Sequence, residues 1–217
     1  MPGSIQAQLS QGEGISEGIR RENLRYRKIA GRGRWNILFL IDTSGSMLSD
    51  DRFAKVKGCV ISLLEGAYAK RVRVAVISYG GGGARLDLPF TASTELAAKR
   101  IGSLKGGGST PLVQALGLAG NLLERMRDES ISIYLLSDGR YNRSTTGREN
   151  WQIREFGEFC KSRGIPITLI DAGNDSRTAR ERVALFAAQL HARYQRLENL
   201  RIDYPSAEDR EQPAVTG

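Results

Sequence analysis

The chain has 217 residues, of which 40% are hydrophobic and 26% are charged, and its formal net charge is +8. This length suits one α/β domain with extensions, and the composition excludes a chain that is disordered throughout. No apolar run is long enough to span a membrane, and the first residues lack the basic and apolar pattern of a signal peptide. We therefore expect a cytoplasmic protein without a membrane partner.

The two ends of the chain differ in composition from the part between them. Residues 1–34 form a basic arm that carries half of the excess positive charge, and residues 205–217 are polar and low in hydrophobic residues. We expect a flexible arm, a folded domain over residues 35–204 and a disordered tail. Because the arm has a single aromatic residue, Tyr26, and no zinc-ligand pattern, the sequence argues against nucleic acid as a partner.

Short apolar runs alternate with helical patterns along the domain. This alternation predicts βαβ units around a mostly parallel, doubly wound sheet with helices on both faces. The expected strands are Asn36–Ile41, Val72–Tyr79, Ala84–Phe90 at an edge, Ile131–Ser137, Ile165–Ile170 and Leu200–Tyr204. The expected helices are Asp51–Lys70, Ser93–Leu104, Pro111–Arg127, Asn150–Arg163 and Thr178–Tyr194.

Several conspicuous residues have ordinary structural interpretations. Cys59 and Cys160 are too few for a disulfide framework and are expected to be buried free thiols within helices. His191, the only histidine, is expected to be an ordinary residue of the last helix. Trp35 and Trp151 are interpreted as packing residues, with a partner surface as the alternative for Trp151.

Oxygen-bearing side chains gather where strands are expected to end. Asp42, Ser44 and Ser46 follow the first strand, Thr110 ends a loop with three glycines, and Asp138 follows the strand that ends at Ser137. The carboxyl ends of parallel strands share one edge of a sheet, which is where ligands bind in this fold class. Two carboxylates and three hydroxyls suit a hard dication such as Mg²⁺, with Mn²⁺ as an alternative.

The segment Leu40-Ile41-Asp42-Thr43-Ser44-Gly45-Ser46-Met47 resembles the first motif of von Willebrand factor A (vWA) domains. The Thr110 loop and Leu136-Ser137-Asp138-Gly139 resemble the other two motifs of their metal-ion-dependent adhesion site. The resemblance covers about residues 36–203 and implies a doubly wound sheet with one antiparallel edge strand. It also implies that Ser44 and Ser46 bind the metal directly, while Asp42, Thr110 and Asp138 bind it directly or through water.

A narrower resemblance is to the C-terminal module of the D subunit of magnesium chelatase and its cobalt-chelatase relatives. It rests on the arginine-rich run before Trp35, on Arg52–Lys57, on Leu86–Phe90 and on the Gly-Gly-Gly-Ser-Thr-Pro loop. The resemblance implies a docking role between an AAA+ ATPase subunit and a larger catalytic subunit in tetrapyrrole metal insertion. The chain has no Gly-Lys-Ser/Thr phosphate loop, so we expect a stand-alone module or a fragment whose ATPase is a separate partner.

The ligand set favours binding over catalysis. Two carboxylates balance a dication, so an open coordination position can accept an acidic residue from a partner. No histidine base follows these strands, and Ser44 stands where a haloacid-dehalogenase-like phosphotransferase would carry its second aspartate. Two further interpretations remain open: an adaptor for another AAA+ ATPase, such as a MoxR-like one or a metal-cofactor assembly system, and an extracellular adhesion domain.

Overall fold

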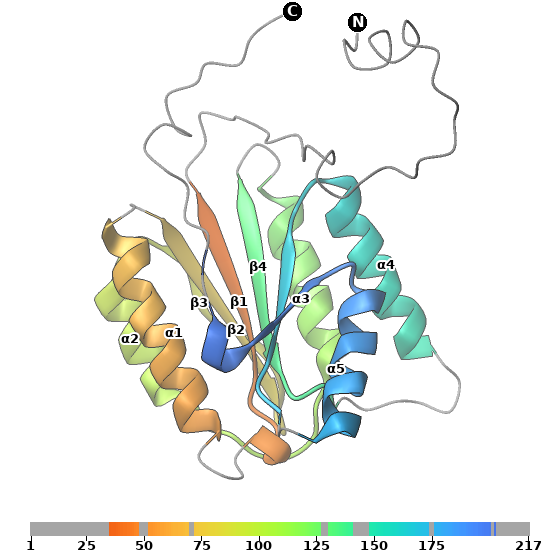
Figure 1. The fold of residues 1–217 in the computed structure, drawn as a ribbon. Helices are drawn as coiled ribbons and strands as arrows, with labels where there is room; N and C mark the ends of the chain where they lie inside the picture. Colours follow the sequence, from red (N-terminus) through yellow and green to blue (C-terminus); the bar gives the residue numbers. More distant parts are fainter. Residues whose placement is uncertain are drawn as a thin grey trace, which may run out of the picture.

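A computed structural model describes residues 35–47, 52–69, 72–126, 130–140, 148–173, 176–200 and 202. The predicted arm and the predicted tail lie outside these residues. The described part forms one α/β unit in which a sheet is covered by helices on both faces (Figure 1). The predicted doubly wound fold is confirmed.

The sheet has six strands in the order β3-β2-β1-β4-β5-β6. Neighbouring strands run parallel except β2 and β3, which are antiparallel because a short glycine turn joins them. The predicted edge strand is therefore the antiparallel one. The strands are β1 (Asn36–Asp42), β2 (Arg73–Gly80), β3 (Gly83–Thr91), β4 (Ile131–Ser137), β5 (Ile167–Asp171) and β6 (Arg193–Arg196).

Successive side chains of the central strands enter two separate cores. In β1, Leu38 and Leu40 pack on one face of the sheet, while Phe39 and Ile41 pack on the other. This explains the continuous apolar run, since a strand covered on both faces has no polar side. The first core is closed by α3 (Leu112–Glu124), α4 (Arg148–Ser162) and α5 (Arg177–Gln189), and the second by α1 (Arg52–Ala69) and α2 (Thr94–Ser103).

The last helix and the last strand differ from the prediction. α5 ends at Gln189, and the chain turns at His191, whose φ is 51°. The amide of His191 donates to Ala188 O at 3.2 Å and that of Ala192 to Ala187 O at 2.8 Å, a Schellman closure of the helix. This closure frees residues 193–196 to form β6, whereas Leu200 and Ile202 are described outside any strand. The sequence did not predict this helix end, because His191 occupies the left-handed position that glycine usually holds.

Two other structural interpretations need revision. Trp151 on α4 is 62% exposed, so it is not a packing residue, while Trp35 packs against the second core. Cys160 is buried and Cys59 is half-buried, and both are free thiols. Within the described residues, none of the helices combines the length and the apolar character that a membrane crossing needs.

Candidate metal centre

The loop after β1 is built around the buried carboxylate of Asp42. Its Oδ1 accepts a hydrogen bond from the amide of Ser44 at 2.9 Å, which bends the chain directly after the strand. Its Oδ2 accepts one from the hydroxyl of Ser137 at 3.0 Å, which ties β1 to β4. The bend places the hydroxyls of Ser44 and Ser46 3.1 Å apart. Two serines separated by a single residue therefore bring their hydroxyl oxygens close together.

The carboxylate of Asp138 has spare capacity to bind a ligand. It follows β4 and is 2% exposed. Its Oδ1 accepts the amide of Arg140 at 2.9 Å, and the Arg140 Nε lies 3.8 Å from Oδ2. Oδ2 is buried and has no hydrogen-bond partner among the described residues. A buried carboxylate oxygen without a partner is energetically unfavourable, so a cation at this atom would supply a missing interaction.

The two aspartates influence each other electrostatically. Burial raises the pKa of Asp42 to about 6, hydrogen bonds from Ser44 and Ser137 oppose the rise, and the charge of Asp138 adds to it. Two carboxylates that repel each other within a buried site favour a dication between them, because the cation offsets the repulsion and the lost hydration together.

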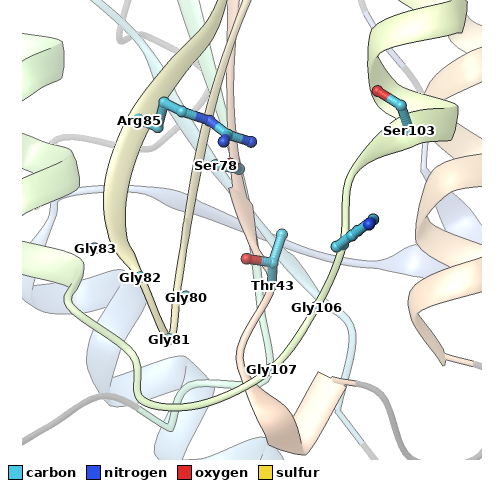
Figure 2. A pocket seen from close by; sticks show the side chains of 11 residues that line it. Thr43, Ser78, Gly80, Gly81, Gly82, Gly83, Arg85, Ser103, Gly106 and Gly107 are labelled. Carbon is cyan, nitrogen blue, oxygen red and sulfur yellow. The ribbon is translucent and has the colours of Figure 1, made fainter.

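Two glycine-rich segments hold the loop that leads to Thr110. The amide of Gly81 donates to Gly107 O at 2.6 Å, and that of Gly107 donates to Thr43 O at 2.7 Å. Figure 2 shows Gly81, Thr43 and Gly107 side by side. A Cβ on Gly108, whose φ is 71°, would lie 2.3 Å from Gly81 Cα. The backbones approach this closely only because glycine has no side chain, so the glycine turn between β2 and β3 also fixes the neighbouring loop.

All five predicted positions lie at the end of β1 or in the loops at the same edge of the sheet. Gly45, between the two serines, donates its amide to Gly108 O at 2.9 Å, so the Thr110 loop is bonded to the loop after β1. Thr110 is 7% exposed. The structure thus shows contacts between Asp42 and Ser44 and between the two serine hydroxyls, and an electrostatic interaction between Asp42 and Asp138. It places the Thr110 loop beside them.

Sequence reasoning assigned no role to three polar residues near this edge. Ser137 donates to Asp42 and accepts the amide of Gly139 at 3.1 Å. Asp171 ends β5, and its two carboxylate oxygens accept from the Gly173 amide at 2.8 Å and the Tyr194 hydroxyl at 2.7 Å. The position of Ser137 within the Leu-Ser-Asp-Gly motif is visible in the sequence. The sequence does not reveal that Tyr194 is the partner of Asp171, because its helical pattern extends over Tyr194.

The donor set fits Mg²⁺ or Mn²⁺ better than a metal that prefers nitrogen or sulfur ligands. It consists of carboxylate and hydroxyl oxygens, which hard dications prefer, and it offers no nitrogen or sulfur. Among the described residues, no three His, Cys, Asp or Glu side chains cluster, which agrees with a site made of two carboxylates and several hydroxyls. A metal held by Asp42, Ser44, Ser46, Thr110 and Asp138 stays a prediction.

Comparison with known proteins identifies the fold family. A sequence model of the von Willebrand factor type A domain matches residues 37–140. An uncharacterised protein of Methanocaldococcus jannaschii is 31% identical over 125 residues, which are 55% of this chain and 71% of that protein. The chain belongs to the von Willebrand factor type A domain family.

Relatives of the vWA domain include subunits of magnesium chelatase. The 60 kDa subunit of Cereibacter sphaeroides is 32% identical over 183 residues, which are 81% of this chain and 32% of that subunit. The chain therefore spans about a third of the length of this relative. Among solved structures, manganese-loaded TRAP protein of Plasmodium vivax has a TM-score of 0.61 at 15% identity, over 77% of this chain and 70% of that chain. At this identity the likeness shows the fold alone.

Proposed function

We propose that this vWA domain is a cytoplasmic, Mg²⁺-dependent protein-interaction module. Asp42, Ser44, Ser46, Thr110 and Asp138 hold the ion in this proposal, and a carboxylate of a partner protein completes its coordination. The observation that carries the proposal is the buried Oδ2 of Asp138, which lacks a hydrogen-bond partner among the described residues in a site of oxygen donors. A fold of this kind can carry a dication, since the structurally similar TRAP protein is manganese-loaded.

The site's residues have distinct tasks in this mechanism. The Ser44 amide and the Ser137 hydroxyl hold Asp42 in place, and burial keeps competing water away from both aspartates. A bound dication supplies positive charge for an incoming carboxylate. Arg140 stands beside Asp138 and adds positive charge at the rim. No described histidine lies near the strand ends, since His191 pairs with Glu158 at 2.6 Å between α5 and α4, so this chain's contribution is docking.

The similarity to magnesium-chelatase subunits supports a more specific partner pair. We propose that the module connects an AAA+ ATPase with a larger catalytic subunit that inserts Mg²⁺ or Co²⁺ into a tetrapyrrole. The alternative is an adaptor for another AAA+ ATPase, such as a MoxR-like one. The archaeal relative, of which the chain covers 71%, is uncharacterised and favours neither version.

A titration tests both versions. The chain is titrated with the chelatase AAA+ subunit and, separately, with a MoxR-like ATPase from the same organism, each in Mg²⁺ and in a chelator. We expect binding to one of them that requires Mg²⁺ and that Asp42→Ala abolishes.

The matched control is Asp171→Asn, which changes a carboxylate at the same edge that is already hydrogen-bonded through both oxygens. This control should bind like the wild type. Equal affinity with Mg²⁺, with chelator and in Asp42→Ala would contradict the metal-bridge mechanism.

A further inference from the structure

A polar cavity of about 590 Å³ lies directly beside the candidate metal centre. It is lined by Thr43, which stands between the proposed ligands Asp42 and Ser44, and by the glycine segments 80–83 and 106–107. The other polar lining residues are Ser78, Arg85, Ser103 and Lys105. Figure 2 shows Arg85 and Ser78 on the β2–β3 side and Gly106 on the opposite side of this space. The metal proposal gives this cavity no function.

The charge of the cavity matches one carboxylate. Arg85 and Lys105 carry positive charge. Asp87 offsets part of this charge, since its Oδ1 lies 2.7 Å from the Nε of Arg85. Asp87 also accepts hydrogen bonds from the amide and hydroxyl of Ser78. Two cations and one anion leave a surplus of one positive charge, which suits a carboxylate better than a phosphate with nearly two negative charges.

Donors for an incoming carboxylate are present. The Arg85 side chain is 72% exposed, and its Nη1 has no partner among the described residues. Lys105 is exposed and forms no ion pair with the described part of the chain. Two glycine amides, by contrast, are already bonded to the main chain: Gly81 to Gly107 O and Gly107 to Thr43 O. The cavity therefore offers side-chain cations, and these glycines do not form a free phosphate cradle.

We propose that this cavity binds a second acidic side chain of the same partner segment whose first carboxylate completes the metal centre. The inference rests on the proposed function. It makes the recognised element a protein segment with two nearby Asp or Glu residues, one at the ion and one at Lys105 and Arg85. A second contact also makes recognition more specific than a single metal–carboxylate bond does. Because both carboxylates belong to one segment, the second contact forms within the bound complex and adds affinity.

The test uses synthetic peptides of glycine and serine that carry one Asp, or two Asp separated by one, two or three residues. Each peptide is titrated into ¹⁵N-labelled full-length chain in Mg²⁺, with amide shifts as the readout. We expect one two-Asp spacing to bind about tenfold more tightly than the one-Asp peptide, a factor typical of one charge-assisted contact. It should also shift the Lys105 and Gly107 amides.

In Lys105→Ala, the best two-Asp peptide should bind only about as tightly as the one-Asp peptide. Lys99→Ala, an exposed lysine on α2, is the matched control and should preserve the tighter binding of the two-Asp peptide. The inference is overturned when no spacing improves on one Asp, or when the advantage survives Lys105→Ala. It is also overturned when inorganic phosphate alone shifts the Lys105 amide more than the two-Asp peptides do.

The same titrations separate this inference from the function on which it rests. One-Asp binding that requires Mg²⁺ and disappears in Asp42→Ala supports the metal bridge even when the second aspartate adds nothing. Absence of Mg²⁺-dependent binding by every peptide contradicts both.

Discussion

Three strands of the sheet, β1, β4 and β5, lead into aspartates at the same edge, yet the surroundings of these aspartates differ. Asp171 is satisfied locally, since the Gly173 amide and the Tyr194 hydroxyl occupy its two oxygens. Asp138 keeps one buried oxygen without a hydrogen-bond partner among the described residues, and the charge of Asp138 raises the pKa of the neighbouring Asp42. The same residue type at neighbouring strand ends is thus a structural anchor in one place and a candidate metal ligand in the others. Neighbouring side chains make the difference.

The largest expected effect separates Asp138 from Asp171. Asp138→Asn removes the carboxylate with the unpartnered oxygen, and we expect Mg²⁺ affinity to fall at least about a hundredfold, or about 2.7 kcal/mol. Asp171→Asn should change it less than about threefold, because both oxygens of this group are already hydrogen-bonded. Calorimetric titration of both variants with Mg²⁺ measures the difference. Similar losses in the two variants would remove the distinction between the aspartates.

The second effect concerns the glycine contact that holds the Thr110 loop beside β1. Gly108→Ala combines a left-handed φ of 71° with a Cβ placed 2.3 Å from Gly81 Cα. We expect a loss of about 2 kcal/mol in the free energy of unfolding and weaker Mg²⁺ binding.

The matched control is Gly82→Ala, since no atom lies within 4 Å of the position that its Cβ would take. It should change stability by less than about 0.5 kcal/mol. Urea unfolding compares the two variants, and equal stabilities would show that the close approach of the two loops is unimportant.

A smaller effect is expected at the anchor itself. Tyr194→Phe removes the hydroxyl that donates to Asp171 at 2.7 Å, and we expect a loss of about 1 kcal/mol in the free energy of unfolding with Mg²⁺ affinity unchanged. A double-mutant cycle with Asp171→Asn should show non-additive losses, because both changes remove the same interaction. Additive losses would mean that the pair is not coupled.

The smallest expected effect is a pH dependence of this anchor. Burial, together with the hydrogen bond to Asp171 and its charge, raises the pKa of Tyr194 from 10 to about 12. The folded state therefore binds the Tyr194 proton more tightly than the unfolded state does. The contribution of the protonated tyrosine to stability is complete below pH 10 and disappears as pH rises to about 12. The difference in unfolding free energy between wild type and Tyr194→Phe should narrow over this range. A constant difference would contradict the shifted pKa.

Most of the fold was predictable because the central strands are apolar on both faces and the first four helices have clear periodicity. The strand Ile131–Ser137 was predicted to the residue. The last helix and strand were less predictable, since His191 occupies the left-handed position at which a glycine usually indicates the end of a helix. Trp151 illustrates a second limit, because a side chain's exposure depends on what packs against its helix.

The candidate site, like the fold, was predictable from the sequence only in part. The sequence by itself determined the central strands and the order of the oxygen-bearing residues along them, because apolar patterning is a local property. Only the tertiary structure decided that Ser137 supports Asp42 and that two glycine runs lie backbone to backbone. It also decided that both oxygens of Asp171 are hydrogen-bonded, while one oxygen of Asp138 has no hydrogen-bond partner among the described residues. Those outcomes depend on contacts between residues distant in the chain, which no spacing along the sequence encodes.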